Sequence, residues 1–190
     1  MVCLGNICRS PLAEGILQAK ADKAGLNWQV SSAGTAGYHL GEAPHRESQK
    51  VARLHGIDIS AQQCRQFCQE DINSFDRIFV MDRDNYAAVK KISGSNWNPE
   101  KVALVLDFLY PGENREVPDP WYGTEKDYHL VYALLPFGAT GQEQSQTNPI
   151  VSPARPAPQT ANLILGNLAN FSFDGVRPGT VFFRSTVSGT

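Results

Sequence analysis

Near its start the chain runs Cys3-Leu4-Gly5-Asn6-Ile7-Cys8-Arg9-Ser10-Pro11. The five residues between Cys3 and Arg9 can curl around a phosphate group if part of the backbone adopts left-handed angles, which Gly5 and Asn6 tolerate best. The planar guanidinium of Arg9 can then hold two phosphate oxygens. The stretch therefore predicts an oxyanion-binding loop that has a cysteine at its start.

A helix is predicted immediately after this loop. Ser10 is a candidate cap, Pro11 suits the first helical turn, and Gly25 marks the end. A helix N-terminus carries unpaired N–H groups and the positive end of the helix dipole, so it attracts a phosphate. The same field favours the thiolate of Cys3, which is the nucleophilic form, and the hydroxyl of Ser10 can donate a hydrogen bond to that sulfur.

These residues also allow a purely structural interpretation. Cys3 would then be a buried residue at a strand end, and Arg9 a solvated charge at the start of a helix. A cysteine with an arginine six residues later is a weak signal by itself. The Gly-Asn pair inside the spacing and the Ser-Pro pair after it favour the catalytic interpretation.

Hydrophobic patterns downstream predict the elements that must position the loop. Strands are expected at residues 28–34, 76–82 and 101–109, and helices at 10–25, 45–56, 83–92 and 128–135. The unbroken apolar run Ile78–Met81 indicates a strand that is buried on both faces. This alternation is typical of an α/β fold with a parallel sheet.

Composition narrows the function classes. The 190 residues are 42% hydrophobic, enough for one core, and carry a net charge of −2 without a clustered basic run, so nucleic-acid binding is not expected. The sequence contains no run of 18 apolar residues, so no membrane span is predicted. Four cysteines are too few for a secreted disulfide scaffold, so we expect a cytoplasmic protein. We also expect a monomer. A composition break near Pro136 predicts a domain at 1–136 and a low-complexity, disordered tail at 137–190.

CLGNICRSPLAEG at residues 3–15 resembles the active-site loop of the low-molecular-weight protein tyrosine phosphatases. The resemblance continues through SSAG, GIDIS, CRQ, FVMDRDN and VPDPWYG, and so covers roughly residues 1–135. It implies a three-layer α/β sandwich, in which a central four-stranded parallel sheet has helices on both faces and the phosphate loop follows the first strand. It also implies hydrolysis of phosphotyrosine proteins or aryl phosphates without a cofactor or metal.

The resemblance assigns a role to each matching residue. Cys3 would form a cysteinyl-phosphate, Arg9 would bind the phosphate, and Asp119 would act as general acid and then as general base. The remaining phosphate-binding positions would be Leu4, Gly5, Asn6, Ile7, Cys8 and Ser10, the aromatic walls Tyr38, Trp121 and Tyr122, and the loop supports Ser32 and Gln62. Asp119 also fits a turn-forming Asp-Pro, and the aromatic residues also fit ordinary half-buried positions.

The other sulfur and imidazole groups carry weaker hypotheses. By resemblance, Cys8 would form a protective disulfide with Cys3 under peroxide. Cys64 and Cys68 fit small packing residues better than a redox pair or half a metal site. The four histidines, His39, His45, His55 and His129, show no ligand spacing.

Two departures from the family concern the ends of the fold. Only Met1 and Val2 precede Cys3, so the central first strand is expected to be truncated, at a cost of about 6–12 kcal/mol and with its hydrogen-bond ladder missing. That cost rivals the whole stability of a domain, about 5–15 kcal/mol. The final helix is expected to be cut short at Pro136.

Three alternatives therefore stay open beside the phosphotyrosine phosphatase. Two are sister chemistries on the same fold, a phosphoarginine phosphatase and a thiol-dependent arsenate reductase. By resemblance Ile7 favours phosphotyrosine, because threonine stands there in phosphoarginine phosphatases, and the Cys64/Cys68 pair lacks the spacing of an arsenate reductase. The third is an inactive, truncated phosphate-binding remnant.

Overall fold

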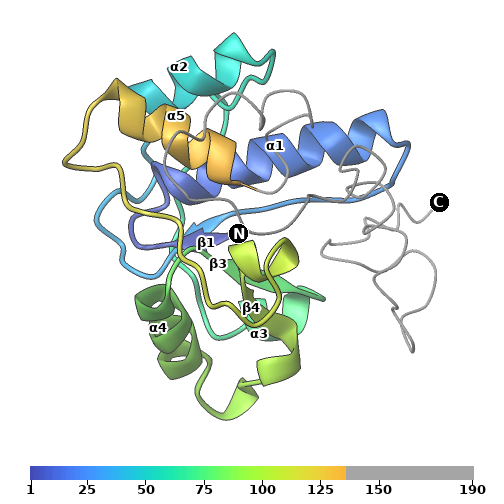
Figure 1. Cartoon of the computed structure of the whole chain (residues 1–190). Coiled ribbons are helices and arrows are strands. Elements are labelled where there is room, and N and C mark those ends of the chain that lie inside the picture. The colour runs from blue at the N-terminus through green and yellow to red at the C-terminus, as the bar shows by residue number, and fades with distance from the viewer. Residues whose placement is uncertain (136–190) are drawn as a thin grey trace.

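One parallel sheet of four strands organises the molecule (Figure 1). The computed structural model describes residues 1–135, and the predicted tail at 137–190 lies outside the described residues. The strand order is β2-β1-β3-β4, and the bounds are β1 Val2–Cys3, β2 Ala33–Gly34, β3 Ile78–Val80 and β4 Val102–Leu104. All three pairings are parallel, as the alternating pattern predicted.

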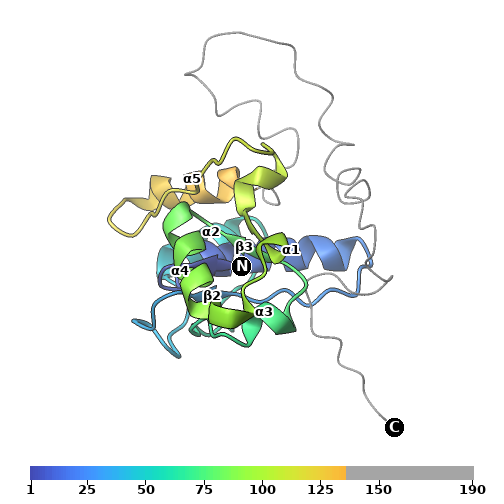
Figure 2. The same cartoon turned by 90° about the horizontal axis from the view of Figure 1, so that it is seen from below.

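Helices cover both faces of the sheet, so the predicted three-layer sandwich is confirmed. On one face lie α1 Arg9–Lys23, α2 Arg46–Leu54 and α5 Glu125–Leu134, and on the other lie α3 Asp71–Ser74 and α4 Arg83–Ser93. Figure 2 shows α3 and α4 on the side of the sheet that faces the viewer, with α1, α2 and α5 behind it. Three short 3₁₀ helices complete the described part: η1 Gly94–Asn96, η2 Pro99–Lys101 and η3 Val105–Phe108.

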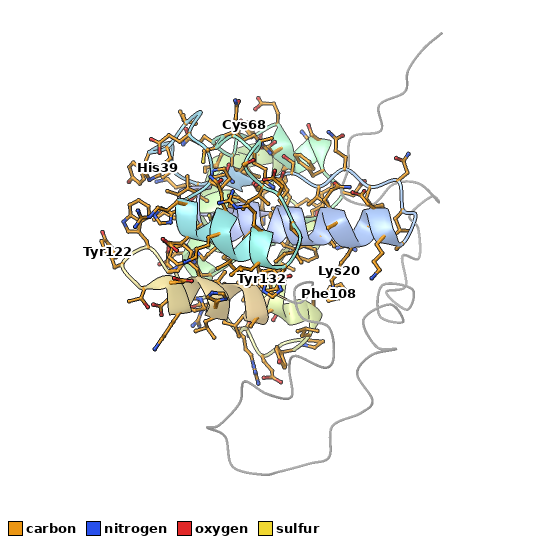
Figure 3. The ribbon with its side chains drawn as sticks, turned by 90° about the horizontal axis from the view of Figure 1, so that it is seen from above. Lys20, His39, Cys68, Phe108, Tyr122 and Tyr132 are labelled. Carbon is orange, nitrogen blue, oxygen red and sulfur yellow. The ribbon has the colours of Figure 1, made fainter. Side chains whose placement is uncertain are left out.

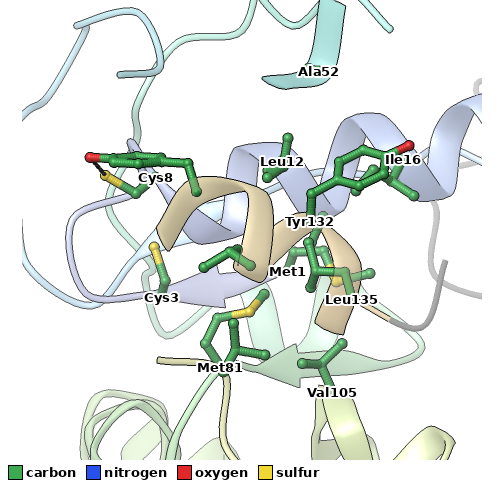
Figure 4. Close-up of a cluster of buried hydrophobic side chains, with 14 of the residues drawn as sticks. Met1, Cys3, Cys8, Leu12, Ile16, Ala52, Met81, Val105, Tyr132 and Leu135 are labelled. Atoms are coloured by element: carbon green, nitrogen blue, oxygen red, sulfur yellow. Dashed lines mark hydrogen bonds between the residues drawn. The ribbon is translucent and has the colours of Figure 1, made fainter. Parts of the chain in front are cut away.

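Two apolar cores lie on the two faces of the sheet. The core under α1, α2 and α5 includes Leu12, Ile16, Val51, Met81 and Leu135 (Figure 4). The core under α3 and α4 includes Ile72, Val80, Val89 and Leu104. Because both faces are covered, the strands contain apolar residues throughout instead of alternating with polar ones.

The first strand is short but central, which corrects the expectation that its ladder would be missing. Val2 pairs with Ala33 on one side and with Val80 on the other. The backbone carbonyl of Met1 accepts a hydrogen bond from Ala33 N at 2.9 Å, and that of Val2 accepts one from Met81 N at 3.1 Å. Even two residues therefore connect β1 to both neighbouring strands, and Cys3 is the second of these residues.

The other predicted strands were too long. Only Ala33 and Gly34 of the predicted strand at 28–34 form β2, because this edge strand pairs with β1, which is itself only two residues long. The backbone before them is bound by the side chain of Gln18. Its amide donates to Trp28 O at 2.9 Å and accepts from Val30 N at 2.8 Å. The prediction at 101–109 merged β4 with η3, because a short buried apolar run fits a strand and a helical turn equally well.

Two helix ends also differ from their predictions. Ser10 is not a cap: α1 begins at Arg9 after Cys8, which makes no capping hydrogen bond through its side chain. The last helix begins at Glu125, three residues before the predicted start, where Thr124 and Asp127 form a capping box. Within residues 1–135, no helix combines the length and the apolar character needed to cross a membrane.

Candidate active site

The oxyanion loop connects the end of β1 to the start of α1, where a helix dipole and the carboxyl ends of parallel strands meet. Asn6, at φ 56°, provides the left-handed turn that the sequence predicted for this loop. Its buried side chain donates to Ser10 Oγ at 3.0 Å and to Ser32 Oγ at 2.7 Å, and accepts from Arg65 N at 2.9 Å. One amide thus ties the loop to three other segments.

The thiol of Cys3 lies at the base of the loop, 2% exposed. Its Sγ is 3.1 Å from Ser10 Oγ and accepts a hydrogen bond from Asn6 N at 3.3 Å. Hydroxyl and amide donors at these positions stabilise a negatively charged sulfur more than a neutral one.

Arg9 is almost completely buried and contacts two carboxylates at once. Nη1 lies 2.6 Å from Asp82 Oδ2 and donates to Val117 O at 3.1 Å, while Nη2 lies 2.6 Å from Asp119 Oδ2. Burial alone would lower the pKa of Arg9, but the negative charges of Cys3, Asp119 and Asp82 outweigh burial and raise it. The guanidinium is therefore a fixed positive charge in a partly water-free site.

A cleft of about 340 Å³ opens above the loop. Its floor is formed by Cys3, Leu4, Gly5, Ile7, Cys8 and Arg9, and its walls by Tyr38, His39, Asp119, Trp121 and Tyr122. His39 and Tyr122 lie at the same edge of the molecule in Figure 3. The structure thus brings together most of the sequence-predicted site residues, whereas Asn6, Ser10 and Ser32 lie behind the floor, where they support the loop.

Asp119 stands on the wall of the cleft with its side chain 40% exposed. Its Oδ1 accepts a hydrogen bond from Trp121 N at 3.1 Å, and its Oδ2 contacts Arg9. The carboxylate therefore bridges the aromatic wall and the guanidinium of Arg9.

Gln62 does not join the predicted support of the loop. Its side-chain oxygen is buried and, within the described residues, has no hydrogen-bond partner. Arg65 takes the predicted place instead, because its backbone N–H reaches Asn6 Oδ1. Within the same residues, no group of three or more His, Cys, Asp or Glu side chains could hold a metal ion.

Sequence reasoning missed several residues of the site. Asp82 lies two residues after the end of β3, and a carboxylate at the end of a buried apolar run is the signal that could have located it. The sequence shows no ligand spacing for His45, but its ring packs on Trp121 and stacks on Tyr128 at centroid distances of 5.8 and 5.2 Å. Tyr128 in turn has its hydroxyl 3.7 Å from Cys8 Sγ.

The three free thiols near the cleft differ in their surroundings. Burial is the main cause that raises the pKa of Cys8 to about 12, and it also raises the pKa of Cys64 to about 11. Both thiols therefore stay protonated at neutral pH. Cys3 alone among them accepts a hydrogen bond from a backbone amide, that of Asn6, and its sulfur also lies beside the hydroxyl of Ser10.

The cleft has a cysteine on its floor, a buried arginine beside that cysteine and a carboxylate on its wall. This arrangement is that of the cysteine-dependent phosphatases. A sequence model described as low molecular weight phosphotyrosine protein phosphatase matches residues 1–141. The chain belongs to this family, whose members are hydrolases that use a cysteine nucleophile.

Individual relatives agree with the family model. The human low molecular weight phosphotyrosine protein phosphatase is 35% identical over 133 residues, which is 69% of this chain and 84% of the human protein. The crystal structure of YfkJ from Bacillus subtilis aligns with a TM-score of 0.65 at 33% identity, over 77% of this chain and 94% of YfkJ. Vibrio vulnificus Wzb in complex with benzylphosphonate aligns with a TM-score of 0.62 at 27% identity, over 70% and 88% of the two chains.

Proposed function

We propose that this chain hydrolyses phosphotyrosine through a cysteinyl-phosphate on Cys3. The observation that carries the proposal is the sulfur of Cys3, which lies on the cleft floor, accepts a hydrogen bond from Asn6 N and lies 3.1 Å from the hydroxyl of Ser10. Groups that can donate a hydrogen bond stabilise negative charge on sulfur when it attacks phosphorus and again when it leaves the intermediate.

The first step transfers the phosphoryl group. The thiolate of Cys3 attacks phosphorus while the bond from phosphorus to the phenolic oxygen breaks, and Asp119 donates its proton to that oxygen. The guanidinium of Arg9 and the loop amides hold the other phosphate oxygens. In the second step Asp119, now ionised, takes a proton from water, the water oxygen attacks phosphorus, and the thiolate leaves.

The contact between Arg9 and Asp119 links substrate binding to the first step. In the structure Nη2 of Arg9 is occupied by Asp119 at 2.6 Å, so an arriving phosphate oxygen must take the place of that carboxylate. Release from the arginine frees Asp119 to carry a proton toward the leaving group. Asp82 keeps Nη1 in place during this exchange.

An aryl phosphate suits the cleft better than a small alkyl phosphate. Tyr38, Trp121 and Tyr122 surround the opening, and they offer apolar ring surface to a phenyl group. Wzb, whose structure contains benzylphosphonate, has the same fold at 27% identity. We infer that the substrates are phosphotyrosine proteins or smaller aryl phosphates.

We further propose that the chain acts in the cytoplasm as a monomer. The four cysteines are all free in the structure, which suits a reducing compartment. Gel filtration with light scattering tests the monomer, and cell fractionation tests the location.

The function is tested with a phosphotyrosine peptide at mildly acidic pH, in the presence of a chelator. We expect turnover by the full chain, a loss of about a thousandfold or more in Cys3→Ser, and wild-type turnover in Cys68→Ser, whose thiol is exposed and outside the cleft. A phosphoarginine peptide and arsenate with thioredoxin serve as alternative substrates. Faster turnover of either one, or no turnover by the wild type, would overturn the proposal.

A further inference from the structure

The thiol of Cys64 lies directly behind the oxyanion loop. Its side chain is 5% exposed, and its Sγ donates a hydrogen bond to the backbone carbonyl of Asn6 at 2.7 Å. The next residue, Arg65, binds the other oxygen of Asn6, the side-chain Oδ1, through its backbone N–H. Two successive residues of a distant segment therefore hold both oxygens of the one loop residue with a left-handed backbone.

This contact determines the orientation of one peptide group in the loop. No peptide bond in the described residues is cis, and the C=O and N–H of a trans peptide point in opposite directions. Because the carbonyl of Asn6 points to Cys64, the N–H of Ile7 in the same peptide points to the opposite side of the loop. Ile7 lines the cleft and Asn6 does not, so that opposite side is the cleft floor.

We propose that Cys64 is a positioning residue, which holds the Asn6–Ile7 peptide so that the N–H of Ile7 is presented to the phosphate. The inference rests on the proposed phosphatase function. A hydrogen bond accepted at the carbonyl also polarises the peptide, which strengthens its N–H as a donor. Burial, together with the nearby charges of Cys3 and Glu42, raises the pKa of Cys64 to about 11, so its proton is available for donation.

Two variants distinguish a positioning role of Cys64 from a role in packing alone, because the two roles predict opposite effects of these substitutions. Valine matches the size and apolar character of a buried cysteine but cannot donate, whereas serine donates but is more polar. If Cys64 positions the peptide, Cys64→Ser should resemble the wild type and Cys64→Val should be impaired. If Cys64 only fills space, Cys64→Val should resemble the wild type and Cys64→Ser should be impaired.

The experiment measures the dissociation constant of inorganic phosphate by calorimetry, beside kcat/KM for p-nitrophenyl phosphate. We expect phosphate binding to weaken about threefold to tenfold in Cys64→Val, with a similar loss in kcat/KM, and to stay within about twofold of wild type in Cys64→Ser. Cys68→Val and Cys68→Ser are the matched controls, because that thiol is exposed and contacts Asp71 rather than the loop.

Thermal unfolding of each variant shows that the compared proteins are folded, and Cys64→Ala replaces Cys64→Val if the larger side chain prevents folding. Wild-type phosphate affinity in the variant that lacks the donor would overturn the inference, as would equal weakening in Cys64→Ser. Phosphate binding does not require turnover. A wild type that binds phosphate without hydrolysing the ester would therefore overturn the proposed function, while the binding series still decides the role of Cys64.

Discussion

Asp82 holds the guanidinium of Arg9 with one carboxylate oxygen and caps helix α4 with the other. Its Oδ2 lies 2.6 Å from Arg9 Nη1, and its Oδ1 accepts a hydrogen bond from Asn85 N at 2.7 Å. The helix on one face of the sheet is thereby joined to the loop that begins the helix on the other face. Because Nη1 is fixed in this way, Nη2 is the part of the guanidinium that contacts Asp119 and that the proposed mechanism offers to the substrate.

Substitution of Asp82 should separate its two roles. Asp82→Asn keeps an oxygen that can cap α4 but loses the negative charge, so we expect kcat/KM to fall about tenfold with little change in the free energy of unfolding. Asp82→Ala also loses the cap, which should cost about 0.5–2 kcal/mol. Urea unfolding and steady-state kinetics measure the two effects. Equal stability loss in both variants would contradict this division.

Asp119→Asn should remove the general acid while it preserves the shape of the cleft wall. General acid catalysis contributes about 10²–10⁴ in rate, so we expect a loss of that order for phosphotyrosine. The loss should be smaller for p-nitrophenyl phosphate, because its leaving group needs protonation less. Glu116→Gln is the control, since Glu116 pairs with Arg83 on the surface. The same loss for both esters would argue against Asp119 as the acid.

His45 should make stability depend on pH. Its Nδ1 accepts the capping hydrogen bond from Glu47 N at 3.3 Å, which requires an unprotonated nitrogen. Burial lowers the pKa of His45, an effect that Arg46 and His39 reinforce and that Glu47 opposes. The unfolded chain therefore binds the proton more readily, so this part of the stability is present above about pH 6.5 and is lost as pH falls below it.

His45→Asn keeps an acceptor for the cap and removes the titrating group. We expect its free energy of unfolding to fall less between pH 7.5 and pH 5 than that of the wild type. His129→Asn should retain the wild-type fall, since His129 is on α5 and pairs with Glu125. Urea unfolding at the two pH values checks this, and identical falls for the wild type and His45→Asn would contradict it.

Mild peroxide should inactivate the protein reversibly. Peroxide oxidises the Cys3 thiolate to a sulfenic acid, and the thiol of Cys8 then displaces water to form a disulfide. Because Cys8 is held protonated beside Tyr128, we expect this second step to be slower than the first. A thiol reductant should restore the wild type but not Cys8→Ser. Mass spectrometry that finds only sulfinic or sulfonic Cys3 in the wild type would contradict the mechanism.

The sequence by itself determined the loop and the class of fold. Cys3, Arg9 and the left-handed Asn6 lie within one short segment, so their spacing alone limits their geometry. The buried apolar run of β3, followed by α4, was also readable, because periodicity and burial are local patterns. The lengths of β2 and η3 were not predictable from the sequence. The short partner strand β1 limits β2, and a short apolar run fits a strand and a helical turn equally well.

Only the tertiary structure decided which distant residues support the loop. Asp82 meets Arg9, and Cys64 meets Asn6, across separations that no sequence pattern specifies. Gln62 was expected in that support and is absent from it, while its neighbours Cys64 and Arg65 provide it. A shift of two or three residues along the chain leaves composition and spacing almost unchanged, yet it determines which polar group reaches the oxyanion loop. That choice depends on how separate segments pack, which local propensity does not determine.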